Sequence, residues 1–313
     1  NSGGSSSFDV VITVNDMAPS ALSYNSPNVF TKGTAIASLL PTVSGTVIIY
    51  SITPSLPLGL NFNTATGEIS GTPSVVSSTI TYTVTATNSG GSSSFDVVIT
   101  VNDMAPSALS YNSPNVFTKG TTIASLLPTV SGNVISYSIT PSLPLGLNFN
   151  TATGEISGTP TVVSGNATYT VTATNSGGST SFDVVITVND IAPSSLSYNS
   201  PNVFTKGTAI ASLLPTVSGT VISYSITPSL PLGLNFNTAT GEISGTPTVV
   251  SGNATYTVTA TNSGGSTSFD VVITVNDIAP SVLSYNSPNV FTKGTAIASL
   301  LPTVSGTVIS YSI

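Results

Sequence analysis

The sequence predicts an all-β chain in which two-sheet sandwiches follow one another and form an elongated rod. Three observations predict this fold class. A repeat of 87 residues runs through the chain without insertion or deletion. Each repeat holds about seven short segments of β-branched and aromatic residues between turn residues, which is the pattern of two-sheet Greek-key sandwiches. No segment of the repeat has the periodicity of an amphipathic helix.

Two short strings mark the repeat. Asn-Ser-Gly-Gly and Ala-Pro-Ser each recur four times, beginning at Asn1, Asn88, Asn175 and Asn262 and at Ala18, Ala105, Ala192 and Ala279. Division after the Asp of Val-Asn-Asp predicts five parts. They are the C-terminal strand of a preceding repeat at 1–16, three complete repeats at 17–103, 104–190 and 191–277, and the N-terminal part of a following repeat at 278–313. We therefore expect a window from a longer array.

The complete repeats are nearly identical. The first two differ at 8 of 87 positions, and the second and third differ at four. Near copies cannot divide different chemical tasks among themselves, so we expect them to supply reach, stiffness or multivalency. A proline near the start of each repeat fixes φ and predicts short, stiff junctions. Strands of about eight residues rise ~3.3 Å per residue, and we expect each whole repeat to add roughly 35–40 Å, so that three repeats would span roughly 110 Å.

Local patterns within the first repeat predict its strands and two hairpins. Residues 82–86 and 95–101 alternate apolar and polar side chains on either side of a Gly-containing turn, which predicts a C-terminal hairpin. Residues 60–62 and 68–70 flank a second turn and predict a second hairpin. Further strands are expected at 22–24, 28–30, 35–40 and 46–53. The aromatic side chains expected in the core are Tyr24, Phe30, Tyr50, Phe62, Tyr82 and Phe95.

The composition excludes several classes of function. The chain has 4 Lys+Arg against 11 Asp+Glu, a net charge of -7, and neither His nor Cys. The basic residues are Lys32, Lys119, Lys206 and Lys293. One Lys per repeat cannot neutralise a run of phosphates, so we exclude nucleic acid as a partner and disfavour an anionic membrane surface. No apolar run approaches the ~20 residues of a membrane helix, so we expect no membrane insertion.

Three strings of the repeat resemble a known family. Leu-Pro-Leu-Gly-Leu at 56–60 is followed by Thr-Gly-Glu-Ile-Ser-Gly-Thr-Pro at 66–73, and Tyr-Thr-Val-Thr-Ala-Thr-Asn at 82–88 leads into the terminal turn. These strings recur in each complete repeat. They resemble the putative-Ig (He-PIG) tandem repeats of giant bacterial cell-surface adhesins, such as the filamentous gliding-type adhesins of Bacteroidota. The resemblance implies an Ig-like or cadherin-like sandwich in a secreted surface protein, and it implies no particular ligand.

Catalytic and cofactor sites are not expected. Without His or Cys, a Ser-His-Asp or Cys-His arrangement cannot form, and zinc lacks its nitrogen and sulfur ligands. Each repeat carries the equivalents of Glu68, Asp96 and Asp103, and a glycosidase would need two such carboxylates that face each other across a cleft. We expect Glu68 and Asp96 to be solvated turn or strand-face residues. The prediction is a chain that is not an enzyme.

Calcium at the linker is the alternative for Asp103. The string Val-Asn-Asp-Met-Ala-Pro at 101–106 resembles a cadherin linker. However, Thr100 and Met104 stand where the cadherin pattern has Asp and Asn, and Ca²⁺ takes about 6–8 oxygen ligands. We expect Asp103 to be a turn residue that satisfies nearby N–H groups, and we expect no metal or cofactor.

Two covalent modifications are suggested by single motifs. Lys32 could form an isopeptide bond with an Asn, although its Thr-Lys-Gly-Thr turn predicts an exposed side chain. Asn166 and Asn253 begin Asn-Ala-Thr glycosylation sequons. The first repeat has Thr79 at this position, so glycosylation there would not be common to all repeats.

The predicted function is that of a non-enzymatic stalk in a secreted bacterial cell-surface adhesin or filament, which extends an adhesive tip from the cell. One alternative is a self-associating extracellular fibre, because the exposed strand faces carry uncharged Thr and Ser. Another is a multivalent glycan-binding array, for which Tyr24 is the candidate platform. The expected partners are the cell surface or other copies of the chain, and glycans under the last alternative.

Overall fold

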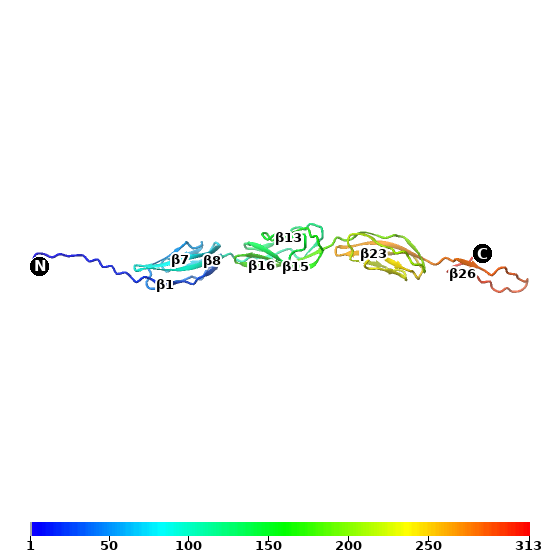
Figure 1. The fold of residues 1–313 in the computed structure, drawn as a ribbon, viewed down its shortest axis with the longest axis horizontal. Helices are drawn as coiled ribbons and strands as arrows, with labels where there is room; N and C mark the ends of the chain where they lie inside the picture. Colours follow the sequence, from blue (N-terminus) through cyan, green and yellow to red (C-terminus); the bar gives the residue numbers. More distant parts are fainter. Residues whose placement is uncertain (1) are drawn as a thin grey trace. The chain divides into compact units, whose positions relative to one another are not determined.

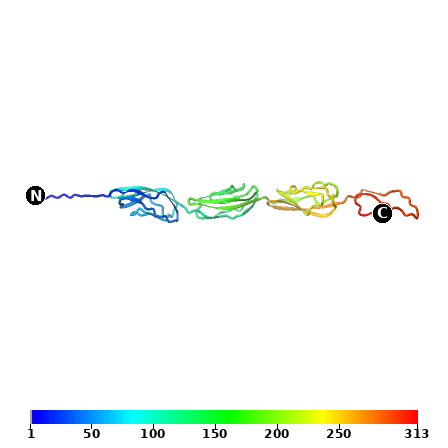
Figure 2. The same ribbon diagram turned by 90° about the horizontal axis from the view of Figure 1, so that it is seen from below.

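The computed structural model describes residues 2–313, and every regular element within them is a strand (Figures 1 and 2). The chain is all-β, as predicted. Its residues group into two compact units. One comprises the residues up to Asn115 with Thr122–Gly158 and Ala167–Ile186, and the other comprises Val116–Thr121, Thr159–Asn166 and Thr187–Ile313. Because the middle repeat contributes to both units, the sandwich is described on the first and third repeats.

Eight strands recur at equivalent positions in each complete repeat. The first repeat contains β1 (Ser20–Ser23), β2 (Asn28–Thr31), β3 (Thr42–Ser44), β4 (Ile49–Thr53), β5 (Leu60–Phe62), β6 (Ile69–Gly71), β7 (Ser77–Asn88) and β8 (Gly91–Asn102). The second contains β9 (Ser107–Ser110), β10 (Asn115–Thr118), β11 (Thr129–Ser131), β12 (Ser136–Thr140), β13 (Leu147–Phe149), β14 (Ile156–Gly158), β15 (Ser164–Asn175) and β16 (Gly178–Asn189). The third contains β17 (Ser194–Ser197), β18 (Asn202–Thr205), β19 (Thr216–Ser218), β20 (Ser223–Thr227), β21 (Leu234–Phe236), β22 (Ile243–Gly245), β23 (Ser251–Asn262) and β24 (Gly265–Asn276).

The larger sheet of the first repeat has the strand order β2-β8-β7-β4. The two 12-residue strands β7 and β8 form the predicted C-terminal hairpin, and β4 pairs antiparallel with β7. At the other edge, β2 pairs in parallel with β8, from Asn28 opposite Ile99 to Thr31 opposite Asn102. The equivalent sheets are β10-β16-β15-β12 and β18-β24-β23-β20. An early and a late strand of each repeat therefore lie side by side.

The second layer consists of short pairs. β1 pairs antiparallel with β3, and β5 pairs antiparallel with β6 as the second predicted hairpin. An isolated bridge between Leu39 and Ile69 connects the segment before β3 to β6. Because each pair is short, this layer depends on the core side chains beneath it more than on long ladders of hydrogen bonds.

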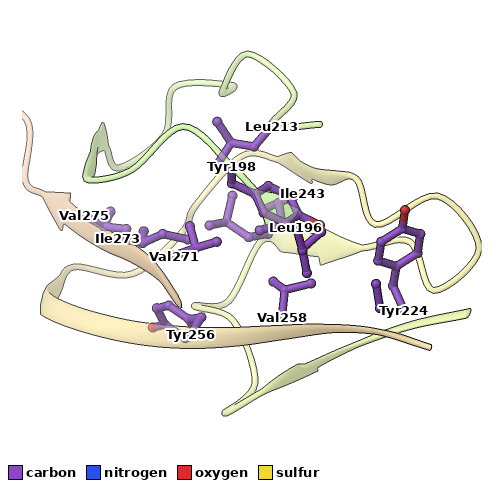
Figure 3. Close-up of a cluster of buried hydrophobic side chains, with 12 residues drawn as sticks. Leu196, Tyr198, Leu213, Tyr224, Ile243, Tyr256, Val258, Val271, Ile273 and Val275 are labelled. Atoms are coloured by element: carbon purple, nitrogen blue, oxygen red, sulfur yellow. The ribbon is translucent and has the colours of Figure 1, made fainter. Parts of the chain in front are cut away.

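Alternation along β7 and β8 places one set of side chains in the core. Tyr82, Val84 and Ala86 of β7 are at most 1% exposed, and so are their neighbours Val97 and Ile99 of β8. The intervening Thr and Ser side chains lie on the outer face of the sheet. Figure 3 shows the equivalent core of the third repeat, in which the labelled side chains include Leu196, Tyr198, Ile243, Val258, Val271 and Ile273.

The predicted core aromatics divide into two groups. The tyrosines Tyr24, Tyr50 and Tyr82 are buried, as expected. The phenylalanines are partly buried and pack against the core cluster; they are Phe30, Phe62 and Phe95. Tyr24 and Phe95 lie in tilted contact with ring centroids 6.3 Å apart.

The structure corrects three strand predictions. The strand predicted at 46–53 begins at Ile49, which pairs with Thr87 of β7. The strand predicted at 35–40 is wrong, because its contacts with β6 are isolated ones. The Ile36 N–H donates to the Gly71 carbonyl at 3.0 Å, and Leu39 forms a single bridge with Ile69. In its place β3 lies just after this segment, at three residues that the sequence pattern did not single out.

The two ends of the chain hold fewer strands. Residues 4–15, which repeat the sequence of β8, form no strand. Residues 278–313 form only β25 (Val282–Ser284) and β26 (Thr303–Ser305), which correspond to β1 and β3.

Candidate functional site

The junction between consecutive repeats is the candidate functional site, because the same contacts join the end of one repeat to the next. Its residues come mainly from the end of one repeat and from the turn between the two long strands of the next repeat, which in the second repeat are β15 and β16. The backbone and carboxylate of the repeat-ending Asp lie between these two parts.

The Asn of the turn holds the start of its own repeat. Asn175 is 7% exposed, and its Nδ2 donates hydrogen bonds to the carbonyl oxygens of Met104 at 2.6 Å and Asn133 at 2.8 Å. Its Oδ1 accepts a hydrogen bond from the Gly177 N–H at 2.8 Å. Asn88 and Asn262 make the same three kinds of bond in the first and third repeats. The buried amide thus fixes the turn against the first residue of the repeat.

The Ser and first Gly of the turn contact the preceding repeat. Asp103 donates its N–H to Ser176 Oγ at 2.9 Å. A Cβ on Gly177 would lie 2.0 Å from the carbonyl oxygen of Asp103, so any side chain there would force the junction apart. The same serine contact recurs between Asp190 and Ser263. Asn-Ser-Gly-Gly is therefore a junction motif as well as a turn.

The Asp103 carboxylate contacts both repeats. Its Oδ1 lies 3.9 Å from Lys32 Nζ in the first repeat, and its Oδ2 accepts a hydrogen bond from Asn133 Nδ2 of the second repeat at 3.3 Å. Oδ1 also accepts the Met104 N–H at 3.0 Å, so Asp103 satisfies a nearby N–H as predicted, although no turn is formed at this residue. One carboxylate thus connects a cation of one repeat to an amide of the next.

The following junction uses a hydroxyl in place of the amide. Thr220 Oγ1 donates to Asp190 Oδ2, the Ile191 N–H donates to Oδ1 at 3.0 Å, and Lys119 Nζ lies 3.7 Å from Oδ1. The Thr220 hydroxyl, then the Ile191 N–H and the Lys119 charge hold the pKa of Asp190 below its ordinary value. This junction therefore favours the ionised Asp.

The other carboxylates of the first repeat lie elsewhere. Asp96 accepts a hydrogen bond from Thr83 Oγ1 across the outer face of the large sheet at 2.7 Å, and Glu68 lies in the turn before β6. The two residues share no partner that would indicate a catalytic pair. Among residues 2–313, no group of three or more His, Cys, Asp or Glu side chains gathers as a metal site would require. The expectation that the chain holds no metal or cofactor stays a prediction.

Lys32 is half-exposed, with 44% of its side chain accessible, as its turn predicted. Its ammonium group lies 3.9 Å from Asp103 Oδ1, and Asn133 bonds to the other oxygen of the same carboxylate. An isopeptide bond at Lys32 stays a prediction. The sequon residues Asn166 and Asn253 lie exposed near the starts of β15 and β23.

Tyr24 contradicts the proposed glycan platform. In the complete repeat it is 8% exposed, and its hydroxyl donates to the Gly67 carbonyl at 2.7 Å. Burial, and then the neighbouring Tyr50, raise the pKa of Tyr24 above the ordinary tyrosine value. A ring in this position packs the core and cannot stack on a sugar. Tyr111 and Tyr198 are buried in the same way.

Sequence reasoning missed most of the junction. Ser176 and Gly177 had been assigned to a simple hairpin turn, and Asn133 and Thr220 had no role. The one available signal is that Asn-Ser-Gly-Gly and Val-Asn-Asp recur together at every boundary.

Comparison with known proteins agrees with this architecture. The He_PIG family model, described as "Putative Ig domain", matches residues 4–102, 105–189 and 185–276. The chain belongs to the He_PIG family. It is a tandem array of Ig-like domains.

Curated relatives of this He_PIG array are bacterial adhesins. The "Serine-rich adhesin for platelets" of Staphylococcus aureus strain MRSA252 is 33% identical over 153 residues, which cover 46% of this chain and 11% of the adhesin. The protein of the same name from strain MSSA476 is 33% identical over 153 residues and is covered to 6%. The chain thus spans only a small part of the length of the relatives it matches.

Solved structures similar to the He_PIG array include tandem Ig domains. The I-band fragment I67–I69 from titin has a TM-score of 0.41 at 14% identity, with coverage of 85% of this chain and 100% of the fragment. Extracellular domains 3–5 of Drosophila OTK have a TM-score of 0.37 at 14% identity, with coverage of 80% and 94%. Within residues 2–313, no helix has the length and apolarity to cross a membrane.

Proposed function

We propose that this chain is the stalk region of a secreted bacterial cell-surface adhesin and extends an adhesive tip away from the cell. The observation that carries the proposal is the junction, in which the Asp103 backbone and carboxylate contact both repeats and leave almost no free linker. Contacts of this kind would restrict the movement of one repeat relative to the next, as a stalk requires. The curated relatives are named as adhesins, which supports a surface location.

The near identity of the repeats supports the same function. Residues 104–190 differ from 191–277 at four positions, so deletion of one repeat removes length and no distinct surface. A ligand-binding array would instead lose valency in proportion to the repeats removed.

The test is an in-frame deletion of 104–190 in the protein on its own cells. We expect the shortened protein to reach the surface at normal levels but to hold cells closer to a target, and to adhere less well through a surface polymer layer. The matched control replaces 104–190 by a second copy of 191–277, which restores the length and should restore adhesion. If the purified 313-residue chain blocked adhesion by itself, the repeats would be the ligand-binding part and the stalk proposal would be wrong.

A self-associating fibre is the second candidate, favoured by the outer face of the large sheet. Hydroxyl groups bond across this face between β7 and β8, as in Thr85 Oγ1 with Ser94 Oγ at 2.9 Å and Thr79 Oγ1 with Thr100 Oγ1 at 2.8 Å. Asp96 is the acidic group of the face, and Thr83 already bonds to it. Two such faces could approach with little charge repulsion.

Light scattering of the 313-residue chain over a wide concentration range separates the two candidates. The stalk proposal predicts the monomer mass of 31.4 kDa throughout. Growth of the mass with concentration would favour the fibre. Small-angle scattering on the same samples would measure whether three repeats span roughly 110 Å, as strand length suggests.

A further inference from the structure

Tension on a stalk would reach each repeat through the chain before β1 and the chain after β8. The first strand, β1, pairs with β3 at two positions, Ser20 with Ser44 and Ser23 with Thr42. Once this short pair yields, tension reaches β2, which lies parallel to β8, the last strand of the repeat. In a parallel pair both strands run in the same direction, so the incoming chain reaches β2 at one end of the ladder and the outgoing chain leaves β8 at the other. Tension would therefore pull the two strands in opposite directions along their shared ladder.

This geometry loads the hydrogen bonds of the ladder together. In an antiparallel hairpin pulled at its open end, the bonds break one after another, and each carries the load alone. In the parallel pair, the bonds between Asn28–Thr31 and Ile99–Asn102 share the load, and none can be lost without sliding the whole strand. We propose that the β2–β8 pair is a force-bearing clamp that keeps each repeat folded when the array is stretched.

Side chains and backbone groups extend the clamp beyond the ladder. At the entry end, the Val98 N–H donates to Ser26 Oγ at 2.9 Å. At the exit end, the Lys32 N–H donates to the Asn102 carbonyl at 2.8 Å, and the Lys32 ammonium lies 3.9 Å from Asp103 Oδ1. The clamp therefore continues at its exit end into the junction residue itself.

The strands of the clamp are fixed on their other sides. β8 is held along most of its length by β7, in a ladder that runs from Asn88 opposite Gly91 to Ser77 opposite Val101. The chain before β2 is held by Asn28, whose Nδ2 donates to the Asn25 carbonyl at 2.8 Å. Of the two ladders that hold β8, the one with β2 is shorter than the one with β7, so the β2–β8 ladder is the one that yields when the repeat unfolds under tension.

The third repeat has the same arrangement. β18 pairs in parallel with β24, from Asn202 opposite Ile273 to Thr205 opposite Asn276. Ser200 Oγ accepts the Val272 N–H at 2.9 Å, and the Lys206 N–H donates to Asn276 at 2.9 Å. An array with the same clamp in every repeat has no weak repeat that yields early.

The clamp can be tested by pulling one repeat in two directions, because the chain has no Cys and each introduced pair of thiols is unique. The full 313-residue chain with Met17→Cys and Met104→Cys is loaded along the ladder. The chain with Thr34→Cys and Met104→Cys is loaded at the exit ends of both strands, so the same ladder peels bond by bond. All three positions are exposed. Complete unfolding would release about 30 nm of chain in the first case and about 24 nm in the second, which identifies the event.

We expect the rupture force in an optical trap to be severalfold higher along the ladder than in the peeling direction at equal loading rate. Equal forces in the two directions would overturn the clamp. The inference rests on the proposed stalk function, because a stalk is the source of the tension. The clamp and the stalk are nevertheless tested by different results. Equal rupture forces leave the deletion result for 104–190 untouched, and a failed deletion experiment leaves the force ratio intact.

A side-chain variant sharpens the test. Ser26→Ala removes the acceptor for Val98 at the entry end, and Ser55→Ala changes an exposed serine in the loop before β5 as the matched control. We expect Ser26→Ala to lower the rupture force along the ladder and to leave the peeling force unchanged, because peeling starts at the opposite end. An equal loss in both directions would mean that Ser26 supports the fold in general and not the clamp.

Discussion

Residues 17–52 and 278–313 have nearly the same sequence in different surroundings. They differ at three pairs of positions, which are Met17/Ile278, Ala21/Val282 and Ile49/Ser310. In the complete repeat, Leu22 and Tyr24 are 5% and 8% exposed, whereas Leu283 and Tyr285 in the partial copy are 59% and 46% exposed. The side chains are the same, so the difference lies in the strands that cover them.

The strands that form in the partial copy show which strand pairs need no other part of the repeat. β25 and β26 pair as β1 and β3 do, because both partners are present. Residues 289–292 repeat the sequence of β2 but form no strand, and within the described residues they have no β8 equivalent beside them. One layer of the sandwich therefore forms its edge pair alone, while the large sheet needs the C-terminal half of the repeat.

Completion of the partial copy should have the largest effect. Addition of the sequence of 53–103 after Ile313 supplies the last residue of the β4 equivalent and the equivalents of β5 to β8. We expect residues 278–313 to fold into a fourth sandwich stabilised by about 5–10 kcal/mol. Hydrogen exchange of the peptide containing Val282, which is unique to this copy, would measure the new protection. Addition of the sequence of 53–90 alone is the control. Because it lacks β8, it should leave the peptide unprotected, and equal protection by both additions would contradict the role given to β8.

Truncation of one core side chain should give the next largest difference, which is a loss of stability in the complete repeat but not in the partial copy. Leu22→Ala in the complete repeat should cost about 2–4 kcal/mol, because it leaves a cavity in the packed core. Leu283→Ala should change the stability by less than about 0.5 kcal/mol, since that side chain is mostly exposed. Exchange of the peptide containing Ile80, which occurs only in the first repeat, reports the first effect. Similar losses at both positions would show that the partial copy is packed after all.

The sequence predicts the local elements of this fold well. The two hairpins follow from alternating side chains around turn residues, as between β5 and β6, where all the information lies within a dozen residues. The buried tyrosines follow from the same alternation. The segment at 35–40 has a similar apolar pattern but meets β6 at isolated positions, and β3 is too short to show any alternation.

Pairings between distant residues could not be read from the sequence. The parallel β2–β8 ladder joins residues from opposite ends of the repeat, and neither strand carries a local mark of its partner. At the junction, Asp103 and Ser176 are 73 residues apart. The recurrence of both motifs shows that they matter, but only the folded hairpin brings the turn of one repeat onto the end of another.

Removal of the buried Tyr24 hydroxyl should give a smaller difference in stability between the complete repeat and the partial copy. Tyr24→Phe should destabilise the first repeat by about 1–2 kcal/mol, because the Gly67 carbonyl loses the hydrogen bond that it receives in the core. Tyr285→Phe should have no measurable effect, since that ring is 46% exposed. Urea unfolding followed by exchange at the Ile80 peptide would measure the difference. A neutral result at Tyr24 would mean that water replaces the hydroxyl at this carbonyl.

Glycine at the irregular position in β1 should stabilise the complete repeat modestly, whereas glycine at the equivalent position should weaken the partial copy. Ala21 has a φ of 53°, and the register of β1 and β3 shifts there, whereas Val282 of the partial copy pairs regularly with Ser305. Ala21→Gly should stabilise the first repeat by about 0.5–1 kcal/mol, because glycine removes the left-handed strain at some cost in chain entropy. Val282→Gly should weaken β25. Thermal unfolding of both variants checks the signs, and Ala21→Val without loss of stability would contradict the strain argument.

The junction should respond to pH in the same way beside a complete and a partial repeat, and this is the smallest effect. Asp190 and Asp277 each accept a hydroxyl hydrogen bond, from Thr220 and Thr307, which is the main reason that the pKa of each lies below the ordinary value of 3.8. The contacts therefore stabilise the ionised forms. Their contribution is fully present above the unfolded pKa and is lost as the pH falls through the lower folded pKa.

Carbon-detected NMR titration of the two carboxyl groups would measure both pKa values in one sample. We expect Thr220→Val to raise the pKa of Asp190 toward 3.8 and to leave that of Asp277 unchanged, and Thr307→Val to do the reverse. Equal depression at both sites would mean that the junction needs only the first half of the following repeat, which distinguishes it from the large sheet. If Asp277 titrated at its ordinary value while Asp190 did not, the carboxylate contact would depend on a complete sandwich, and the junction could form only after the repeat that follows it has folded.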